Sequence, residues 1–302
     1  MRRSPNPLAL LAAALFLAGC GSTTTSTEGA PTPAPSPTPI DPDAPPPAEE
    51  GSGPAVTYRP VQGAAYRLEH RDSLVLQYQG GASQTQARER VAFVRLTIAA
   101  ASAPGSYGVT VTLDSLLALE SGTPVPPDSV AAALGTIWSG TLSSVGTLSE
   151  LKPDRAGTLT AELAGHLRLL FPALPQDGVR EGMQWTDSAS YPLVSDAFTG
   201  SEQSVTVYRA AEKEEVEGRD AISLETSSKY SRTGRRVQGE QELEMTATGT
   251  RSGVHRLSLD GVLVSAQGTD TGEMTISVPA VGQTVPVTRS STYAVSSLSP
   301  GP

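Results

Sequence analysis

Apolar and polar residues alternate with a period of two along most of the chain after residue 57. In the first clear stretch, the aromatic and aliphatic residues on one face are Tyr66, Leu68, Leu74, Leu76 and Tyr78. Polar residues fill the other face, and Gly80-Gly81 follows as a turn signal. This alternation predicts a long, half-buried β-strand.

Two further strands are predicted directly after this one. In the stretch 85–100, the apolar residues begin on Val91 and Phe93 and then shift to Val94, Leu96 and Ile98, which predicts a β-bulge near Phe93. The next strand carries apolar residues on one face at Tyr107, Val109, Val111, Leu113, Leu117 and Leu119. Short turns between the three strands predict a meander.

The second half of the chain, from Trp185 onward, repeats the alternation. Gly218, Gly234, Gly253 and the pair Asp260-Gly261 predict turns, since glycine adopts the positive φ angles that hairpins need. With these breaks, the alternating stretches of the whole chain amount to about eleven strands.

A helical period interrupts the strands between Pro153 and Pro172. Its apolar residues recur at steps of three and four, at Leu159, Leu163, His166, Leu167 and Leu170. Pro172 and Pro175 end the helix. Because its apolar stripe must be buried, the predicted fold is mainly β: one long antiparallel sheet, residues 57–299, with the helix packed on its apolar face.

The segment before the strands resembles a bacterial lipoprotein signal peptide. Arg2 and Arg3 precede a short apolar run, and Leu17, Ala18, Gly19 and Cys20 resemble the lipobox. The resemblance implies removal of residues 1–19, a diacylglycerol on the Cys20 sulfur and acylation of the new amino end, so that lipid holds the protein on a membrane. The apolar run is too short for a spanning helix of roughly 20 residues. An ordinary secretory signal is the alternative.

Residues 20–56 are rich in Pro, Ser, Thr and Ala and have no apolar periodicity. Such a composition predicts a disordered, extended tether. Gly21 stands where the Gram-negative sorting rule would place aspartate for retention at the inner membrane. The expected location is therefore the outer membrane, facing the periplasm, with exposure at the cell surface left open.

The formal net charge of −9 excludes a nucleic-acid-binding protein, because that function needs basic residues to neutralise phosphates. It also makes anionic membrane surfaces poor partners for the folded surface, so the expected membrane contact is through the lipid on Cys20. The oligomeric state is left open.

Two stretches carry a resemblance to the lipoprotein-localisation-factor superfamily of periplasmic carriers and related lipoproteins. They are Gly182-Met183-Gln184-Trp185 and Val216-Glu217-Gly218-Arg219-Asp220-Ala221-Ile222-Ser223-Leu224. The resemblance implies that the sheet is a curved antiparallel half-barrel, with the helix 158–171 packed on its concave face as a lid. It also implies an apolar groove for a lipid or for the acyl group of another protein. The expected lining is Leu74, Leu76, Val111, Leu113, Leu163, Leu167, Leu170, Trp185 and Tyr191. In the alternative, these side chains form a filled core.

The sequence offers little chemistry for catalysis. His70, His166 and His255 lack the spacing of metal ligands, so no metal site, cofactor or catalytic residue is predicted. The triplet Asp270-Thr271-Gly272 matches that of aspartic proteases, but the polar residues before it predict a solvated turn.

Two functions therefore remain. The first is a non-enzymatic envelope lipoprotein that binds or carries a lipid or acyl chain. The second is a structural or interaction module on a lipid tether, without a small-molecule ligand. An apolar cavity of several hundred Å³ would favour the first function.

Overall fold

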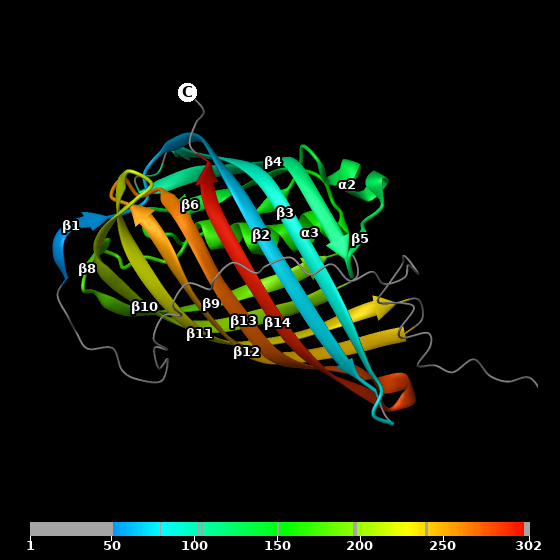
Figure 1. Cartoon of the computed structure of the whole chain (residues 1–302). Helices are drawn as coiled ribbons and strands as arrows, with labels where there is room; N and C mark the ends of the chain where they lie inside the picture. Colours follow the sequence, from blue (N-terminus) through cyan, green and yellow to red (C-terminus); the bar gives the residue numbers. More distant parts are fainter. Residues whose placement is uncertain are drawn as a thin grey trace, which may run out of the picture.

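The computed structural model describes residues 51–298, apart from 79, 102, 104, 150, 196–197 and 239–240. Within these residues, one curved antiparallel sheet of twelve strands dominates (Figure 1). The sheet is open, because β7 and β9 at its two ends do not pair with each other. This confirms the prediction of a mainly β half-barrel.

The strands fall into two sequential sets. The first set is β2 (Val61–Gln77), β3 (Ser83–Ala100), β4 (Ser106–Glu120), β5 (Thr123–Pro124), β6 (Ile137–Ser143) and β7 (Lys152–Pro153). The second set is β9 (Gln184–Ser195), β10 (Phe198–Val216), β11 (Arg219–Gln238), β12 (Gln241–Ser258), β13 (Leu263–Val278) and β14 (Gln283–Leu298). A small separate sheet pairs β1 (Ser52–Val56) with β8 (Val179–Glu181). The helical elements are α2 (Pro127–Ala133), α3 (Thr158–Leu167), η1 (Arg168–Leu170) and η2 (Pro279–Val281).

The sheet joins two meanders through its middle. Its order is β7-β6-β4-β3-β2-β14-β13-β12-β11-β10-β9, with β5 beside β4. The first and last long strands, β2 and β14, therefore pair at the centre. The two ends of the sheet are close in sequence, and α3 lies in the connection between them.

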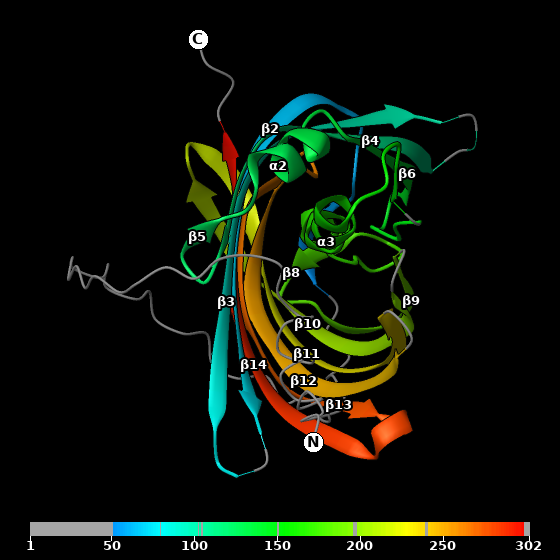
Figure 2. The ribbon, with the colours of Figure 1, turned by 90° about the vertical axis from the view of Figure 1, so that its right-hand side faces the viewer.

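Helix α3 lies on the concave side of the sheet, near one end of the half-barrel (Figure 2). Leu159, Leu163 and Leu167 are buried in the main core, as their spacing predicts. The ring of the fully buried Trp138 on β6 donates a hydrogen bond from Nε1 to the carbonyl oxygen of Thr160, at 3.3 Å. The mid-chain helix packed inside the sheet is thus confirmed.

The predicted β-bulge exists, but the extra residue is on the neighbouring strand. Phe93 pairs with Ser115 and Val94 pairs with Leu113, so Asp114 of β4 has no opposite residue. The change of phase therefore occurs in β4, where Leu117 is 51% exposed and Ala118 faces the core. The expectation that Leu117 shares the buried face of Leu113 is wrong.

Two of the predicted turns are also wrong, since Gly234 and Gly253 lie inside long strands. A methyl group on Gly253 would collide with the hydroxyl of Tyr293. A glycine at this position leaves room for the ring of Tyr293 against the sheet, and it does not form a turn. Gly218 and Gly261 do form turns, with φ angles of 75° and 77°.

The folded part begins before residue 57. Strand β1 lies within the range assigned to the tether, and Val56 is buried in the main core against β8. The burial of Val56 corrects the tether boundary, because an apolar side chain buried in a core fixes the backbone around it. The predicted signal peptide, with Leu17, Ala18, Gly19 and Cys20, and the rest of the predicted tether lie outside the described residues. In the described part, no helix is long and apolar enough to cross a membrane.

Candidate functional site

A large groove with a volume of about 1010 Å³ opens on the concave face of the sheet. Its floor is formed by β2, β12, β13 and β14, and one wall is formed by β3, α3 and the segment from β5 to α2. Residues of β9 and β11 line the opposite wall. In Figure 2, α2 and α3 lie over the upper part of the concave face, and neither extends over the lower part.

One end of the groove is apolar. Its lining there is Leu74, Leu76, Leu243, Met245, Met274, Ile276 and Val287. These side chains belong to a second hydrophobic cluster, which is separate from the main core around α3. Whereas α3 covers the main core, this second cluster borders the groove.

A line of charged residues crosses the sheet between the two clusters, and we call it the charged belt. Its members are Glu202 on β10, Arg251 on β12, Asp270 on β13, Arg289 on β14 and Asp72 on β2. Arg251 donates hydrogen bonds to Glu202 Oε1 at 2.7 Å and to Asp270 Oδ2 at 3.1 Å. Arg289 donates to the same Asp270 oxygen at 3.2 Å and to Asp72 Oδ1 at 2.8 Å. Each charge of the belt therefore has an opposite charge beside it, as buried charges require.

The belt keeps two of its carboxylates, Asp270 and Glu202, ionised. Burial alone would raise the pKa of Asp270, but the guanidinium groups of Arg289 and Arg251 lower it overall. Burial likewise raises the pKa of Glu202, whereas Arg251 lowers it, and the net effect is a lowered pKa. Tyr230 donates to Asp270 Oδ1 at 2.7 Å, and its own pKa is raised, first by burial. Ionised, fully paired groups of this kind stabilise a structure and are not poised to transfer protons.

A second ion-pair group links the sheet to the helix. Arg90 of β3 is 2% exposed and contacts Glu120 of β4 at 3.1 Å and Glu162 of α3 at 3.2 Å. It also donates to the backbone carbonyl oxygen of Leu119 at 2.8 Å. These contacts fix one side of α3 against the wall of the groove.

Two histidines stack between the belt and the helix. The rings of His70 on β2 and His166 on α3 lie 4.0 Å apart with an angle of 23° between their planes. Burial lowers the pKa of His70 to about 4, and burial followed by the neighbouring His70 lowers that of His166 well below its usual value. Both rings are therefore neutral at pH 7. In the sequence, His70 is in phase with Leu68 and Leu74 of its strand, and His166 lies on the apolar stripe of the helix. The sequence could not show that these two faces meet.

Of the nine residues expected to line the groove, two do so, and the other seven lie elsewhere. Leu74 and Leu76 line it. Five others are buried in the main core: Val111, Leu113, Leu163, Leu167 and Leu170. The ring of Trp185 stacks on Tyr208 with centroids 5.0 Å apart. The ring of Tyr191 lies 4.5 Å below the guanidinium carbon of Arg168, which lines the groove.

Sequence reasoning missed the polar residues of the groove, although a signal for them exists. Asp72 is in phase with the buried Leu68 and Leu76 of its strand, and Arg90 is in phase with Ala92 and Val94. A polar residue at an inward position of a strand predicts either a buried pair or a binding site.

The triplet at Asp270 is not in a solvated turn. Asp270 lies in the middle of β13 and is 6% exposed, because it pairs with two arginines of neighbouring strands. Among the described residues, no group of three or more His, Cys, Asp or Glu side chains is placed to hold a metal ion.

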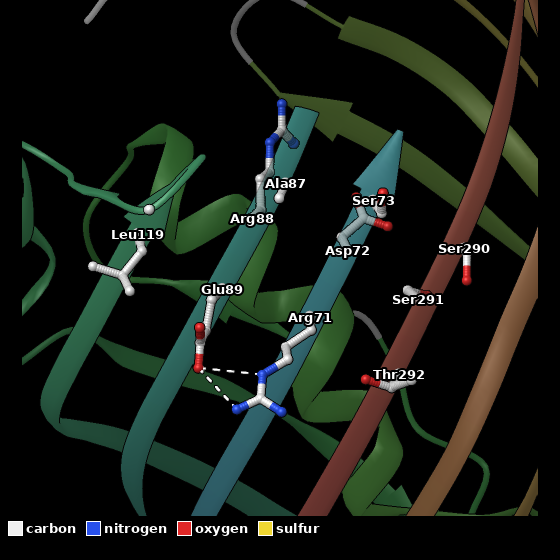
Figure 3. Close-up of a pocket in the computed structure, with 11 residues that line it drawn as sticks. Arg71, Asp72, Ser73, Ala87, Arg88, Glu89, Leu119, Ser290, Ser291 and Thr292 are labelled. Atoms are coloured by element: carbon white, nitrogen blue, oxygen red, sulfur yellow. Dashed lines mark hydrogen bonds and ion pairs between the residues drawn. The ribbon is translucent and has the colours of Figure 1, made fainter. Parts of the chain in front are cut away.

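The convex face carries a smaller hollow of about 300 Å³ over β2, β3 and β14 (Figure 3). Arg71 donates two hydrogen bonds to Glu89 Oε1, at 3.3 and 3.2 Å, at one end of this hollow. Small side chains such as Ser73, Ala87 and Ser290 line the remainder. The hollow is open, and of the four charged residues that line it, Arg71 pairs with Glu89 and Asp72 pairs with Arg289.

Comparisons with known proteins give little guidance. No family model matches the chain, and no curated protein matches it. Among solved structures, an outer membrane channel from Pseudomonas putida F1 is 9% identical, with 83% of this chain and 99% of that chain covered and a TM-score of 0.22. A variant of the Rhodopseudomonas blastica porin is 10% identical, with 77% and 99% covered and a TM-score of 0.20. Likenesses of this size support no inference about the chain.

Proposed function

We propose that this protein is a non-enzymatic, lipid-anchored envelope protein that binds the acyl chain of a lipid, or of an acylated protein, in the groove of its half-barrel. The observation that carries the proposal is the apolar end of the groove, where a separate hydrophobic cluster borders open space. A protein that served only as a scaffold would gain stability by filling this space.

The size of the groove supports this function. Ligand sites of proteins usually have volumes of roughly 300–1,000 Å³, and this groove lies at the upper end of that range. Each methylene group transferred from water into such a site gains about 0.8 kcal/mol. A chain that buries about ten methylenes would therefore gain on the order of 8 kcal/mol, before the costs of association.

The arrangement of charge supports binding over catalysis. The ionised groups of the charged belt are held by opposite charges. A hydrolase would need a nucleophile, or a proton donor and acceptor, free to face the substrate. The anchor rests on the lipobox of the sequence, and residence at the outer membrane rests on Gly21.

The test uses the full chain with Cys20→Ser, which removes the sulfur that would carry the anchor lipid. The protein is purified from a bacterial envelope without detergent, and native mass spectrometry and solvent extraction then measure bound lipid. A Met245→Glu variant places a charge in the apolar end, and Thr246→Glu places the same charge on the convex face of the same strand.

We expect about one lipid or acyl chain per protein, retained by Thr246→Glu and lost from Met245→Glu. Loss is expected because a carboxylate in the apolar end must be desolvated when the chain binds. A protein that carries no lipid and takes up none from phospholipid vesicles would refute the proposal. The structural or interaction module would then be the better description.

A further inference from the structure

Strand β3 directs three polar side chains, Gln86, Arg88 and Arg90, into the groove. Arg90 has the partners described above for both terminal nitrogens of its guanidinium group. Gln86 and Arg88 differ from Arg90, since no hydrogen bond or ion pair is found for either side chain among the described residues.

Gln86 is 1% exposed, and both its amide nitrogen and its amide oxygen are buried without a hydrogen-bond partner. The Nε atom of Arg88 is also buried without a hydrogen-bond partner. A buried polar atom without a partner is costly, so native proteins rarely retain one without a function. Gln86 and Arg88 hold three such atoms on the same face of one strand, and Arg90 Nε is a fourth, which indicates a site whose partner comes from outside the chain.

The carboxylates beside Arg88 are already engaged. Arg88 lies opposite Asp72 on β2 and opposite Glu120 on β4. Asp72 accepts its hydrogen bond from Arg289, and Glu120 pairs with Arg90. Neither carboxylate therefore pairs directly with Arg88, whose guanidinium group makes no ion-pair contact among the described residues.

The position of the pair fits an amphipathic ligand. Gln86 lies opposite Leu74, at the border between the charged residues and the apolar end of the groove. The residues that line the groove include seven basic and four acidic ones, although the chain as a whole has a formal charge of −9. Glu202 and Asp270 offset part of this excess by pairing with Arg232 and Arg289, and the lining remains more basic than the chain as a whole.

We propose that Gln86 and Arg88 bind the anionic headgroup, a carboxylate or a phosphate, of a lipid whose chain lies along Leu74 and Leu76. The guanidinium group of Arg88 donates to two oxygens of the headgroup, and the amide nitrogen of Gln86 donates to one of them. This inference rests on the proposed function, because it names the class of lipid that the groove takes.

The test compares three probes on the full chain with Cys20→Ser, by isothermal titration calorimetry. Palmitic acid has both the chain and the anion, hexadecanol has the chain alone, and inorganic phosphate has the anion alone. The variants are Arg88→Gln and, as a control on the outward face of the same strand, Arg95→Gln.

The acid is expected to bind more tightly than the alcohol, and Arg88→Gln should weaken the acid about 10- to 100-fold while leaving the alcohol unchanged. The control should bind both probes as the parent does. Gln86→Leu, which keeps the site filled and apolar, should also reduce the preference for the acid.

Equal affinity for acid and alcohol, unaffected by Arg88→Gln, would overturn the headgroup site and leave the acyl-binding function standing. Binding of phosphate as tight as that of the acid would overturn the assignment to a lipid, since the chain would then contribute nothing. Failure of both chain-bearing probes to bind would refute the proposed function itself.

Discussion

Acid is expected to weaken this fold through its buried histidines, and His255 on β12 gives the clearest case. Burial lowers the pKa of His255 to about 4, from an ordinary value of 6.5. In the unfolded chain this side chain takes up a proton as the pH falls through 6.5, whereas the folded protein resists protonation until about pH 4. Stability from the neutral ring is therefore complete above pH 6.5 and is lost as the pH falls.

The size of the effect follows from the two pKa values. Between pH 7 and pH 5, a histidine with this shift lowers the free energy of unfolding by about 2 kcal/mol. His70 has a similar shift, and His166 is shifted in the same direction. Carboxylates contribute little in this interval, because in the unfolded chain they titrate near pH 4.

The assay is urea unfolding of the full chain with Cys20→Ser at pH 7 and pH 5, at equal ionic strength, followed by fluorescence of the buried Trp138. In His255→Leu, the loss of free energy between the two pH values should be smaller by about 2 kcal/mol. Thr246→Ala, at an exposed position of the same strand, should keep the parent's pH dependence. If His255→Leu lost as much stability as the parent, the reasoning from burial would be refuted.

Four substitutions test the packing and the charges. Gln86→Leu should raise the free energy of unfolding of the lipid-free protein by about 1–3 kcal/mol, because it removes two buried polar atoms without partners; a urea midpoint no higher than the parent's would contradict this. Gly253→Ala should destabilise the protein by about 1–3 kcal/mol in the same assay, since the methyl group meets the Tyr293 hydroxyl and the backbone oxygen of Gln267. An unchanged midpoint would contradict this. Asp270→Asn should lower the free energy of unfolding by about 3–5 kcal/mol, because it leaves two arginines without an ionised partner. Glu89→Gln, which breaks an ion pair on the outward face, should lower it by at most about 1 kcal/mol. Equal losses of stability would show that burial of the charged belt contributes nothing.

The sheet and its helix could be predicted from the sequence because both depend on local periodicity. The apolar residues of β2 fall on one face at steps of two, and those of α3 recur at steps of three and four. The position of the bulge was less predictable. A phase change in β3 and one in β4 produce similar patterns, and only the pairing of Phe93 with Ser115 shows which strand has the extra residue.

The groove was harder to predict, because its lining comes from strands far apart in the sequence. Periodicity shows that Leu74 and Leu113 both face inward, but it does not show that α3 covers only one of them. The charged belt depends in the same way on register between strands. Asp72 and Arg289 meet only because β2 pairs with β14, which no local pattern indicates.

The pairing of β2 with β14 also determines when the fold can be completed. Asp72 and Arg289, which join these two strands, are 217 residues apart in the chain. Each meander can assemble from contacts between sequence neighbours, but the central seam must wait for the last strand to be synthesised. Until then, β2 and β13 each expose an unpaired edge, and such edges promote aggregation. To avoid aggregation, a growing chain therefore needs β14 to emerge soon after β13, or a chaperone that covers these two edges.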